Sequence, residues 1–432
     1  MKEKIHLKYG DTKCSFTYDM ENIKSIITAN NINENKSFTK IVKEAIANPI
    51  SSKKLSNLVE ERDEVTVVIS DITRSWQKIN EFLPLIISEI KKGGVRLGDI
   101  TVLAATGSHR SHSQKEIIQL LGKDLYGKVK FLDHNCHNND RHIYLGKTSY
   151  GTPVSINEKA VKADKLILTG GITYHDLAGW SGGRKSILPG IASYETIMAN
   201  HSLSLSEQKG EGIKDTVKSG NLENNPVHLD MEEGAEMLKA DFIFNVIPDA
   251  KGGIATAVAG DYKKAHRKGC EIVSELFGIN IEDKADLVIA SCGGFPKDIN
   301  LYQASKGLIN AVSALKKGGY LILLAECQDG IGHPEVTEII NEYANNELRE
   351  EFLRSNFTIS KYSGYLITKA IEDLNLILVS NLNKKLLKNT DIKIVENIDV
   401  ALNIVKDKFK KLPEAYIMAD AANTLPIKEE DM

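Results

Sequence analysis

The segment Val65–Arg74, VTVVISDITR, contains the pattern that decides the fold. Its first six residues are mostly apolar and β-branched in one continuous run, which is typical of a strand covered on both faces by helices. A polar stretch follows directly. Asn80–Lys92 (NEFLPLIISEIKK) then repeats apolar residues every three or four positions, as an amphipathic helix does. This strand–helix order indicates an α/β protein with a largely parallel sheet.

Working outward from this segment, strand-like runs alternate with helical spacing along the chain. We therefore predict two α/β domains, each with a largely parallel sheet flanked by helices, and an active site in the cleft between them. The polar stretch Gly278–Asp286 places the boundary, giving domains of residues 1–278 and 279–432. Whether the last strand, near 415–420, returns to the first domain is left open. Tyr9-Gly10-Asp11 predicts an edge hairpin. The further strands expected are Ile100–Thr106, Val129–Asp133, Lys165–Thr169, Phe242–Ile247, Leu287–Ser291, Tyr320–Ala325, Leu376–Ser380, Ile392–Glu396 and Ala415–Ala419.

Composition excludes several classes of protein. The chain has 432 residues, with 55 Lys+Arg against 58 Asp+Glu, so a strongly basic nucleic-acid scaffold is excluded. The cysteines are odd in number and form no C-x-x-C pair, which argues against a disulfide framework or a thiolate zinc ribbon. No apolar run has the length of a signal peptide core or a membrane span. We expect a soluble, cytoplasmic protein with no membrane or nucleic-acid partner. The five cysteines are Cys14, Cys136, Cys270, Cys292 and Cys327.

Ligands of open α/β sheets bind beyond the carboxyl ends of the strands, and the residues found there are unusual. Glycine, histidine, arginine and acidic residues concentrate at four strand ends, which predicts a site. Structural interpretations stay open, because Asp71 could cap a helix and His109 and His175 could be structural histidines. His112, His134, His137 and His142 are interpreted as solvated loop histidines rather than a metal site. The four strand ends are Asp71–Arg74 (DITR), Gly107–His112 (GSHRSH), Gly170–Asp176 (GGITYHD) and Cys292–Lys297 (CGGFPK).

Three further features point to ligand chemistry. Gly179–Ser186 (GWSGGRKS) resembles a phosphate-cradling loop, although Arg184 stands where a Walker A motif needs glycine; a tight turn is the alternative. His201 ends the expected helix Ser193–Ser202 and is a competent ligand for Zn, Cu or Ni. Gln303 and Lys306 would share one helix face and could clamp a carboxylate, or simply form an exposed polar face.

Together these motifs resemble the nickel-dependent lactate racemase family. They occur in the family's order over residues 65–310, and Gly179–Ile191 is the most specific part. The resemblance rests on Asp71-x-Thr73-Arg74, Thr106-Gly107-Ser108-His109-Arg110, His175, Ala178–Ser186, Leu188-Pro189-Gly190-Ile191, His201 and Tyr302-Gln303-x-x-Lys306.

The resemblance implies a racemase or epimerase that inverts C2 of a 2-hydroxy carboxylic acid. Its cofactor would be the nickel-pincer nucleotide, Ni(II)-pyridinium-3,5-bisthiocarboxylate mononucleotide, supplied by cofactor-synthesis proteins. One histidine would take the hydroxyl proton while hydride passes to the cofactor, and hydride would return to the opposite face of the planar keto acid. The implied roles are acid/base catalysis for His109 and His175, covalent cofactor attachment for Lys185, nickel coordination for His201, cofactor contacts for Asp71, Thr73 and Arg74, and substrate binding for Arg74, Tyr302, Gln303 and Lys306.

Some residues depart from the pattern expected of members that act on lactate. Ser75-Trp76-Gln77, Ser108 and Asp176 suggest a pocket that is larger or more polar than lactate requires. Two alternatives to the racemase are kept. One is a zinc hydrolase with a His109, His175 and His201 site, and the other is a non-enzymatic protein that binds a phosphate ligand through the glycine-rich loop. The oligomeric state is left open.

Overall fold

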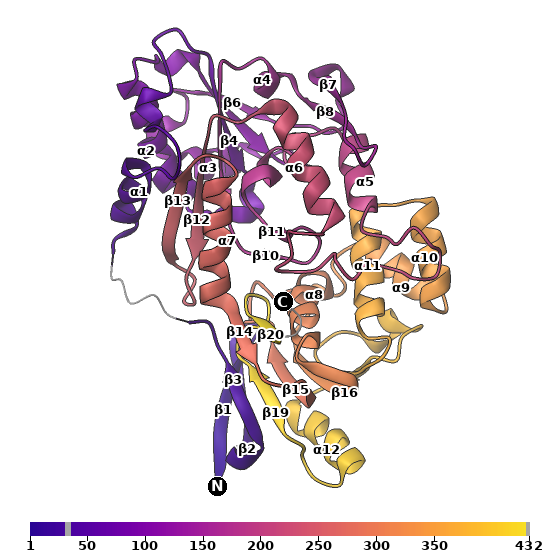
Figure 1. Ribbon diagram of the computed structural model, residues 1–432. Coiled ribbons are helices and arrows are strands. Elements are labelled where there is room, and N and C mark those ends of the chain that lie inside the picture. The colour runs from indigo at the N-terminus through magenta and orange to yellow at the C-terminus, as the bar shows by residue number, and fades with distance from the viewer. Residues whose placement is uncertain (31–35, 429–432) are drawn as a thin grey trace. The chain divides into compact units, whose positions relative to one another are not determined.

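The computed structural model describes residues 1–30 and 36–428, which form two compact units (Figure 1). The first to be described comprises residues 31–204 and 215–274, and we call it the His unit, because it contains His109, His175 and His201. Its six-stranded sheet has the order β13-β12-β9-β4-β5-β6 and is parallel except for β13. The strands are β4 Val65–Ser70, β5 Ile100–Ala105, β6 Lys130–Asp133, β9 Lys165–Gly171, β12 Phe242–Pro248 and β13 Ile254–Gly260.

The central strands of this sheet are buried on both faces, as their unbroken apolar runs predict. Val67 and Ile69 pack with α1, α2 and α3 in one hydrophobic cluster, while Val68, which points the other way, is also fully buried. Two small hairpins, β7–β8 and β10–β11, lie outside the sheet. The remaining elements are α1 Phe38–Ala47, α2 Ile79–Lys92, α3 Gln114–Leu125, β7 His142–Lys147, β8 Pro153–Asn157, α4 Glu158–Val161, β10 Tyr174–His175, β11 Gly179–Trp180, α5 Tyr194–Ser202, α6 Pro226–Leu238 and the start of α7 Lys264–Phe277.

The other unit comprises residues 1–30, 205–214 and 275–432, and we call it the Lys306 unit. Its six-stranded sheet is parallel throughout and has the order β18-β17-β16-β15-β19-β3. The last large-sheet strand of the chain, β19, thus lies between β15 and β3. Its elements are β1 Lys2–Tyr9, β2 Thr12–Asp19, β3 Ile23–Ile27, β14 Gly278–Ile281, β15 Ala285–Ser291, α8 Leu301–Val312, β16 Leu315–Leu324, α9 Pro334–Glu342, α10 Asn346–Ser355, α11 Ile359–Ala370, β17 Asn375–Val379, β18 Lys393–Val395, α12 Ile398–Phe409, β19 Ala415–Met418 and β20 Leu425–Lys428.

The N-terminal hairpin differs from the sequence expectation. β1 and β2 pair only with each other rather than extending the edge of the large sheet. Their inward residues, among them Leu7 and Tyr18, join the cluster that contains Ile289 and Ile322 of the large sheet. The alternation therefore reflects a ribbon with one buried face. It also explains why residues 1–30 group with the C-terminal part of the chain, whereas the sequence placed all of 1–278 in one domain.

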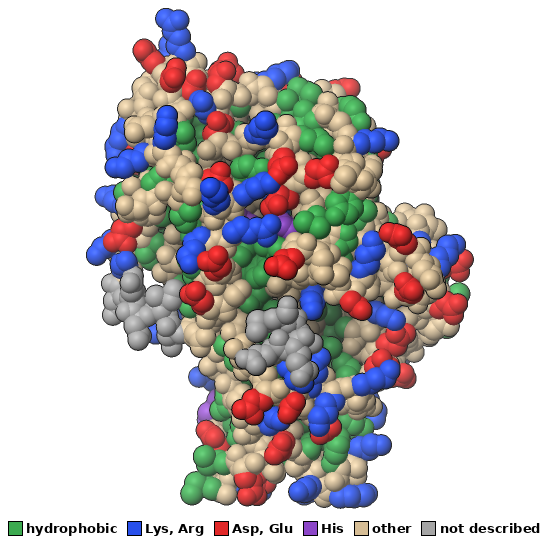
Figure 2. Space-filling model, viewed as in Figure 1, with side chains coloured by type: hydrophobic (Ala, Val, Ile, Leu, Met, Phe, Trp, Pro, Cys, Tyr) green, Lys and Arg blue, Asp and Glu red, His purple; other side chains and the backbone are tan. Residues whose placement is uncertain are grey.

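The α/β class and the largely parallel sheets are confirmed, and most strand bounds agree with the predictions to within one or two residues. β16 begins earlier than expected, at Leu315. Across the described ranges, no helix combines the length and apolar character needed to cross a membrane. On the face shown in Figure 2, basic and acidic side chains are interspersed, in keeping with the small net charge.

Candidate active site

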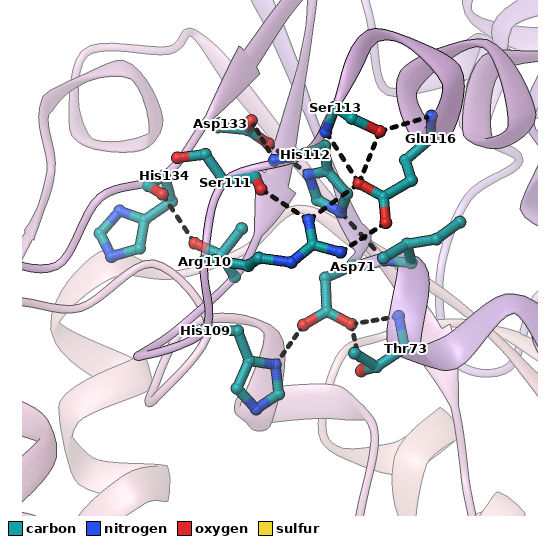
Figure 3. Close-up of polar contacts among 12 residues, drawn as sticks. Asp71, Thr73, His109, Arg110, Ser111, His112, Ser113, Glu116, Asp133 and His134 are labelled. Carbon is teal, nitrogen blue, oxygen red and sulfur yellow. Dashed lines mark hydrogen bonds and ion pairs between the residues drawn. The ribbon is translucent and has the colours of Figure 1, made fainter.

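Asp71 and His109 form a carboxylate–imidazole pair at the carboxyl ends of neighbouring strands (Figure 3). Asp71 follows β4 and is 5% exposed, whereas the His109 side chain, in the loop after β5, is 49% exposed. His109 Nδ1 lies 2.5 Å from Asp71 Oδ2. Because the carboxylate only accepts, Nδ1 carries the proton and Nε2 is left for another partner. The pair therefore orients an imidazole whose second nitrogen is available for acid/base chemistry.

Asp71 also caps the short helix Ile72–Gln77, as its alternative structural interpretation predicted. Its Oδ1 accepts from the Thr73 amide at 2.9 Å and from the Thr73 hydroxyl. Burial raises the pKa of Asp71, but His109, Thr73 and Arg74 together outweigh it through hydrogen bonds and charge, and the net pKa lies below its ordinary value. Arg74 Nη1 donates to Thr73 Oγ1 at 2.8 Å. The Asp71 carboxylate thus both caps the short helix and orients His109.

The glycine-rich loop is a tight turn, and hydrogen bonds to other groups of the protein stabilise it. Gly182 and Gly183 have φ of +75° and +53°, and a Cβ on Gly183 would lie 2.7 Å from the His266 ring, so both positions favour glycine. The amide of Gly183 donates to Asn245 Oδ1 at 2.8 Å, and that of Lys185 to Gly182 O at 3.1 Å. These amides are therefore satisfied inside the protein, which does not favour the phosphate-cradle interpretation.

Arg184 is the buried anchor of this loop. It is 2% exposed, and it donates to Trp180 O at 3.0 Å and to Ala178 O at 2.7 Å. Its Nη1 also lies 3.0 Å from His266 Nε2, which in turn is 2.9 Å from Ser181 O. Burial lowers the pKa of Arg184 to about 10, so it still carries its charge at neutral pH. These contacts fix the loop and so position the next residue, Lys185.

Lys185 of the glycine-rich loop contacts His175 of β10. Lys185 Nζ lies 3.0 Å from His175 Nε2. Burial, followed by the charge of Arg184, lowers the pKa of Lys185 to about 7. Burial, followed by the charge of Lys185, lowers that of His175 to about 4. His175 Nδ1 lies 3.2 Å from the Leu177 amide and 3.1 Å from Asp176 Oδ1, and its Nε2 faces the Lys185 amine. With a pKa of about 7, a large fraction of Lys185 is the nucleophilic free amine at neutral pH.

His201, near the end of α5, is 4% exposed, and its Nδ1 has no hydrogen-bond partner among the described residues. Burial, followed by the charges of Lys185 and then His175, lowers its pKa to about 3, so the ring is neutral at physiological pH. A neutral buried imidazole with an unused nitrogen is suited to bind a metal ion. Arg74 also acts on the pKa values of Lys185 and His175, so the groups of the His unit share one electrostatic environment.

Tyr302, Gln303 and Lys306 lie on the first turns of α8, in the Lys306 unit. Lys306 Nζ donates to Gln303 Oε1 at 2.9 Å, so the two side chains share a helix face as their spacing indicates. The Tyr302 ring lies 6.3 Å from that of His333. This bond leaves the Gln303 amide N–H groups and the Lys306 charge on one surface. Their expected contact with a substrate stays a prediction, as does the interdomain position of the site.

The interpretation of the four histidines as solvated loop residues is wrong for three of them. His142 begins strand β7, and both of its ring nitrogens are buried without a hydrogen-bond partner among the described residues. The His112 side chain is 1% exposed, and His134 is 1% exposed with its Nε2 2.9 Å from Ala192 O. The polar sequence around His112 and His134 predicted solvent exposure, but both rings are covered by chain segments that are distant in sequence. Within the part of the chain that the structure describes, no three His, Cys, Asp or Glu side chains are placed to hold a metal ion. This disfavours a three-histidine zinc site.

Asn245 and His266 were missed by sequence reasoning. Asn245 is a fully buried amide inside β12, and His266 lies on α7. A polar residue within the otherwise apolar run FIFNVI was the one available signal for Asn245. Nothing in the local sequence marks His266, because its partner loop is about 80 residues away.

Comparison with known proteins decides the family. Residues 9–212 match the Lactate racemase N-terminal domain, and residues 281–424 match the Lactate racemase C-terminal domain. The lactate racemase of Thermoanaerobacterium thermosaccharolyticum is 40% identical over 331 residues, covering 76% of this chain and 75% of that one. The chain belongs to the lactate racemase family.

Other relatives agree with this assignment. The lactate racemase of Lactiplantibacillus plantarum is 35% identical over 331 residues, covering 76% of each chain. The solved lactate racemase apoprotein from T. thermosaccharolyticum superposes with a TM-score of 0.90 at 32% identity, covering 98% of this chain and 100% of that one. A Thermotoga maritima protein shares the fold, with a TM-score of 0.65 at 18% identity over 92% of this chain and 100% of that one. Membership makes this chain an enzyme of the isomerase class.

Proposed function

We propose that this enzyme inverts the C2 centre of a 2-hydroxy carboxylic acid, with lactate as the first candidate substrate. The family assignment supports the reaction class, and the observation that carries the proposal is the Lys185–His175 pair beside the buried His201. A lysine of lowered pKa, an acid/base imidazole and a metal-binding imidazole in one environment are what a lysine-tethered nickel cofactor would require.

His109 and His175 are the proposed acid/base groups. Racemisation needs a base for the hydroxyl proton of either enantiomer and an acid for its return, so two imidazoles are required. Asp71 on Nδ1 leaves His109 Nε2 for the hydroxyl proton. His175 Nε2 contacts Lys185, and conversion of that amine to a thioamide removes a charge that lowers the pKa of His175. Attachment of the cofactor would therefore tune the second base.

The residues present fit the nickel-pincer nucleotide. Lys185 would hold it covalently, since its lowered pKa of about 7 leaves much of the amine unprotonated at neutral pH. His201 would be the protein ligand to nickel, through a neutral ring that has an unpartnered nitrogen. Asp71, Thr73 and Arg74 would contact the nucleotide. When bound, the group supplies the hydride acceptor and donor that the reaction needs.

The substrate carboxylate is assigned to cationic and amide donors. Arg74 in the His unit and Tyr302, Gln303 and Lys306 in the Lys306 unit are the proposed contacts. Trp76 packs against the hydrophobic core and Gln77 is 3% exposed. Any preference for polar substrates would therefore come from Ser75, Ser108 and, nearest to His175, Asp176. Its Oδ1 lies 3.1 Å from His175 Nδ1, next to the reacting groups. We include longer or hydroxylated 2-hydroxy acids in the substrate class.

A cytoplasmic location and dependence on cofactor-synthesis proteins complete the proposal. All five cysteines are free thiols, and four of them are buried, which suits a reducing compartment. The pincer nucleotide must be made elsewhere and delivered before Lys185 can hold it.

The test loads the full chain by co-production with the cofactor-making enzymes. Intact-mass spectrometry should show an adduct on the wild type that is absent from Lys185→Ala. Single enantiomers of lactate and larger 2-hydroxy acids, followed by chiral chromatography, should racemise with the wild type. His109→Gln and His175→Gln should each lose about a hundredfold or more in kcat.

Two outcomes would overturn the proposal. An unmodified protein whose turnover with zinc is undiminished in Lys185→Ala would support a hydrolase. Full racemase activity in both histidine variants would remove the assigned acid/base groups. Lys53→Ala, an exposed lysine, is the matched control and should retain both adduct and activity.

A further inference from the structure

His112 lies three residues after His109 in the same loop, and its contacts are those of a built positioning element. Its side chain is 1% exposed. His112 Nδ1 is 2.5 Å from Asp133 Oδ1, and its own amide donates to Asp133 Oδ2 at 2.9 Å. Asp133, the last residue of β6, thus holds both the ring and the backbone of His112 (Figure 3).

The other ring nitrogen of His112 reaches the Asp71 segment. The Ile72 amide donates to His112 Nε2 at 3.0 Å. Since Nε2 accepts, the proton of the neutral ring lies on Nδ1, where the Asp133 carboxylate accepts it. Asp133 therefore selects the tautomer that can bind Ile72. The opposite tautomer would aim an N–H at the Ile72 N–H.

The loop after β5 therefore contributes two histidines that bind two adjacent residues of the segment after β4. His109 binds the Asp71 side chain, and His112 binds the Ile72 backbone. Ile72 also begins the short helix that carries Thr73 and Arg74, so a shift at its amide would displace these two residues, which are proposed to contact the cofactor. The His112 ring therefore links Asp133 to the Ile72 backbone through hydrogen bonds, in addition to packing.

We propose that His112 and Asp133 are positioning residues that keep the Asp71 carboxylate on His109 Nδ1 while His109 gains and loses its proton. The inference rests on the proposed acid/base role of His109. If the inference is correct, residue 112 must supply a hydrogen-bond acceptor to the Ile72 amide, and a side chain that only fills the space will not replace it. A misplacement of Asp71 by a fraction of an ångström is enough to reduce catalysis.

The test compares His112→Leu, which fills space without an acceptor, with His112→Gln, whose Oε1 can accept from Ile72. On the full-length apoprotein, NMR follows the downfield imidazole N–H signal of His109, assigned by its loss in Asp71→Asn. We expect the signal to vanish in His112→Leu and to persist in His112→Gln. In loaded enzyme, kcat should fall about tenfold to a hundredfold in His112→Leu and recover in His112→Gln to within about threefold.

Asp133→Asn provides a second route that does not remove the ring. An amide N–H₂ donating to Nδ1 favours the wrong tautomer, so the His109 signal should weaken and kcat should fall. This variant decides the matter if His112→Leu does not fold. His6→Leu, an exposed histidine of β1, is the control and should change neither signal nor kcat.

Persistence of the His109 signal and of kcat in both His112→Leu and Asp133→Asn would overturn the inference. Equal losses in His112→Leu and His112→Gln would also overturn it, because the acceptor would then be irrelevant. Neither result touches the proposed function, which falls instead if His109→Gln and His175→Gln remain fully active.

Discussion

At Lys185, burial and a neighbouring guanidinium act on one amine. Both lower its pKa, to about 7, whereas an ordinary lysine titrates near pH 10.4. An amine with a lowered pKa is protonated below that value and nucleophilic above it. Lys185 should therefore differ from the surface lysines in its reactivity at neutral pH.

The prediction concerns the apoprotein treated with a limiting amine-acylating reagent. Peptide mapping should show that Lys185 is acylated preferentially at neutral pH, with a rate that is half-maximal near pH 7. Exposed Lys53 supplies the reference profile in the same sample. Equal pH profiles for the two lysines would contradict the assigned environment.

At the scale of the element, the glycine-rich loop Gly179–Ser186 depends on one buried cation. Arg184→Met would keep most of the volume while removing the donors to Ala178 O and Trp180 O. Buried carbonyls left without partners should lower the free energy of unfolding by about 3 kcal/mol. Urea unfolding followed by circular dichroism measures the loss.

Arg62→Met, an exposed arginine, should leave the urea midpoint of the protein unchanged. If Arg184→Met were as stable as the wild type, the guanidinium would not anchor the loop. A further readout is the acylation of Lys185, whose pH dependence should change when Arg184 no longer contributes its charge.

At the scale of the whole molecule, the two compact units contribute different proposed functions. The residue proposed for cofactor attachment lies in the His unit, and part of the proposed carboxylate-binding set lies in the Lys306 unit. Lys306→Met should therefore raise KM for a 2-hydroxy acid by about tenfold to a hundredfold, as loss of a charge-assisted hydrogen bond does. The Lys185 adduct should form normally.

Steady-state kinetics and intact-mass spectrometry check both parts of this prediction. Lys316→Met, which removes an exposed lysine paired with Asp286, is the matched control. An unchanged KM in Lys306→Met, or loss of the adduct, would contradict the separation of roles between the units.

The sequence by itself determined most strands of the two large sheets and indicated the candidate residues of the site. Continuous apolar runs such as Val65–Ser70 report burial on both faces, and the polar residues directly after them mark the binding edge of a parallel sheet. Asp71, His109, His175, Lys185 and His201 could be singled out because each belongs to a local motif that is readable over a few residues.

Tertiary structure alone decided which residues hold those groups in place. The Asp133–His112–Ile72 chain, the Arg184–His266 contact and the packing of β1–β2 on a sheet formed by the far end of the sequence all join distant segments. Burial of His112 and His134 had the same origin. Local polarity predicts exposure only when the neighbours in space are also the neighbours in sequence, and at this site they are not.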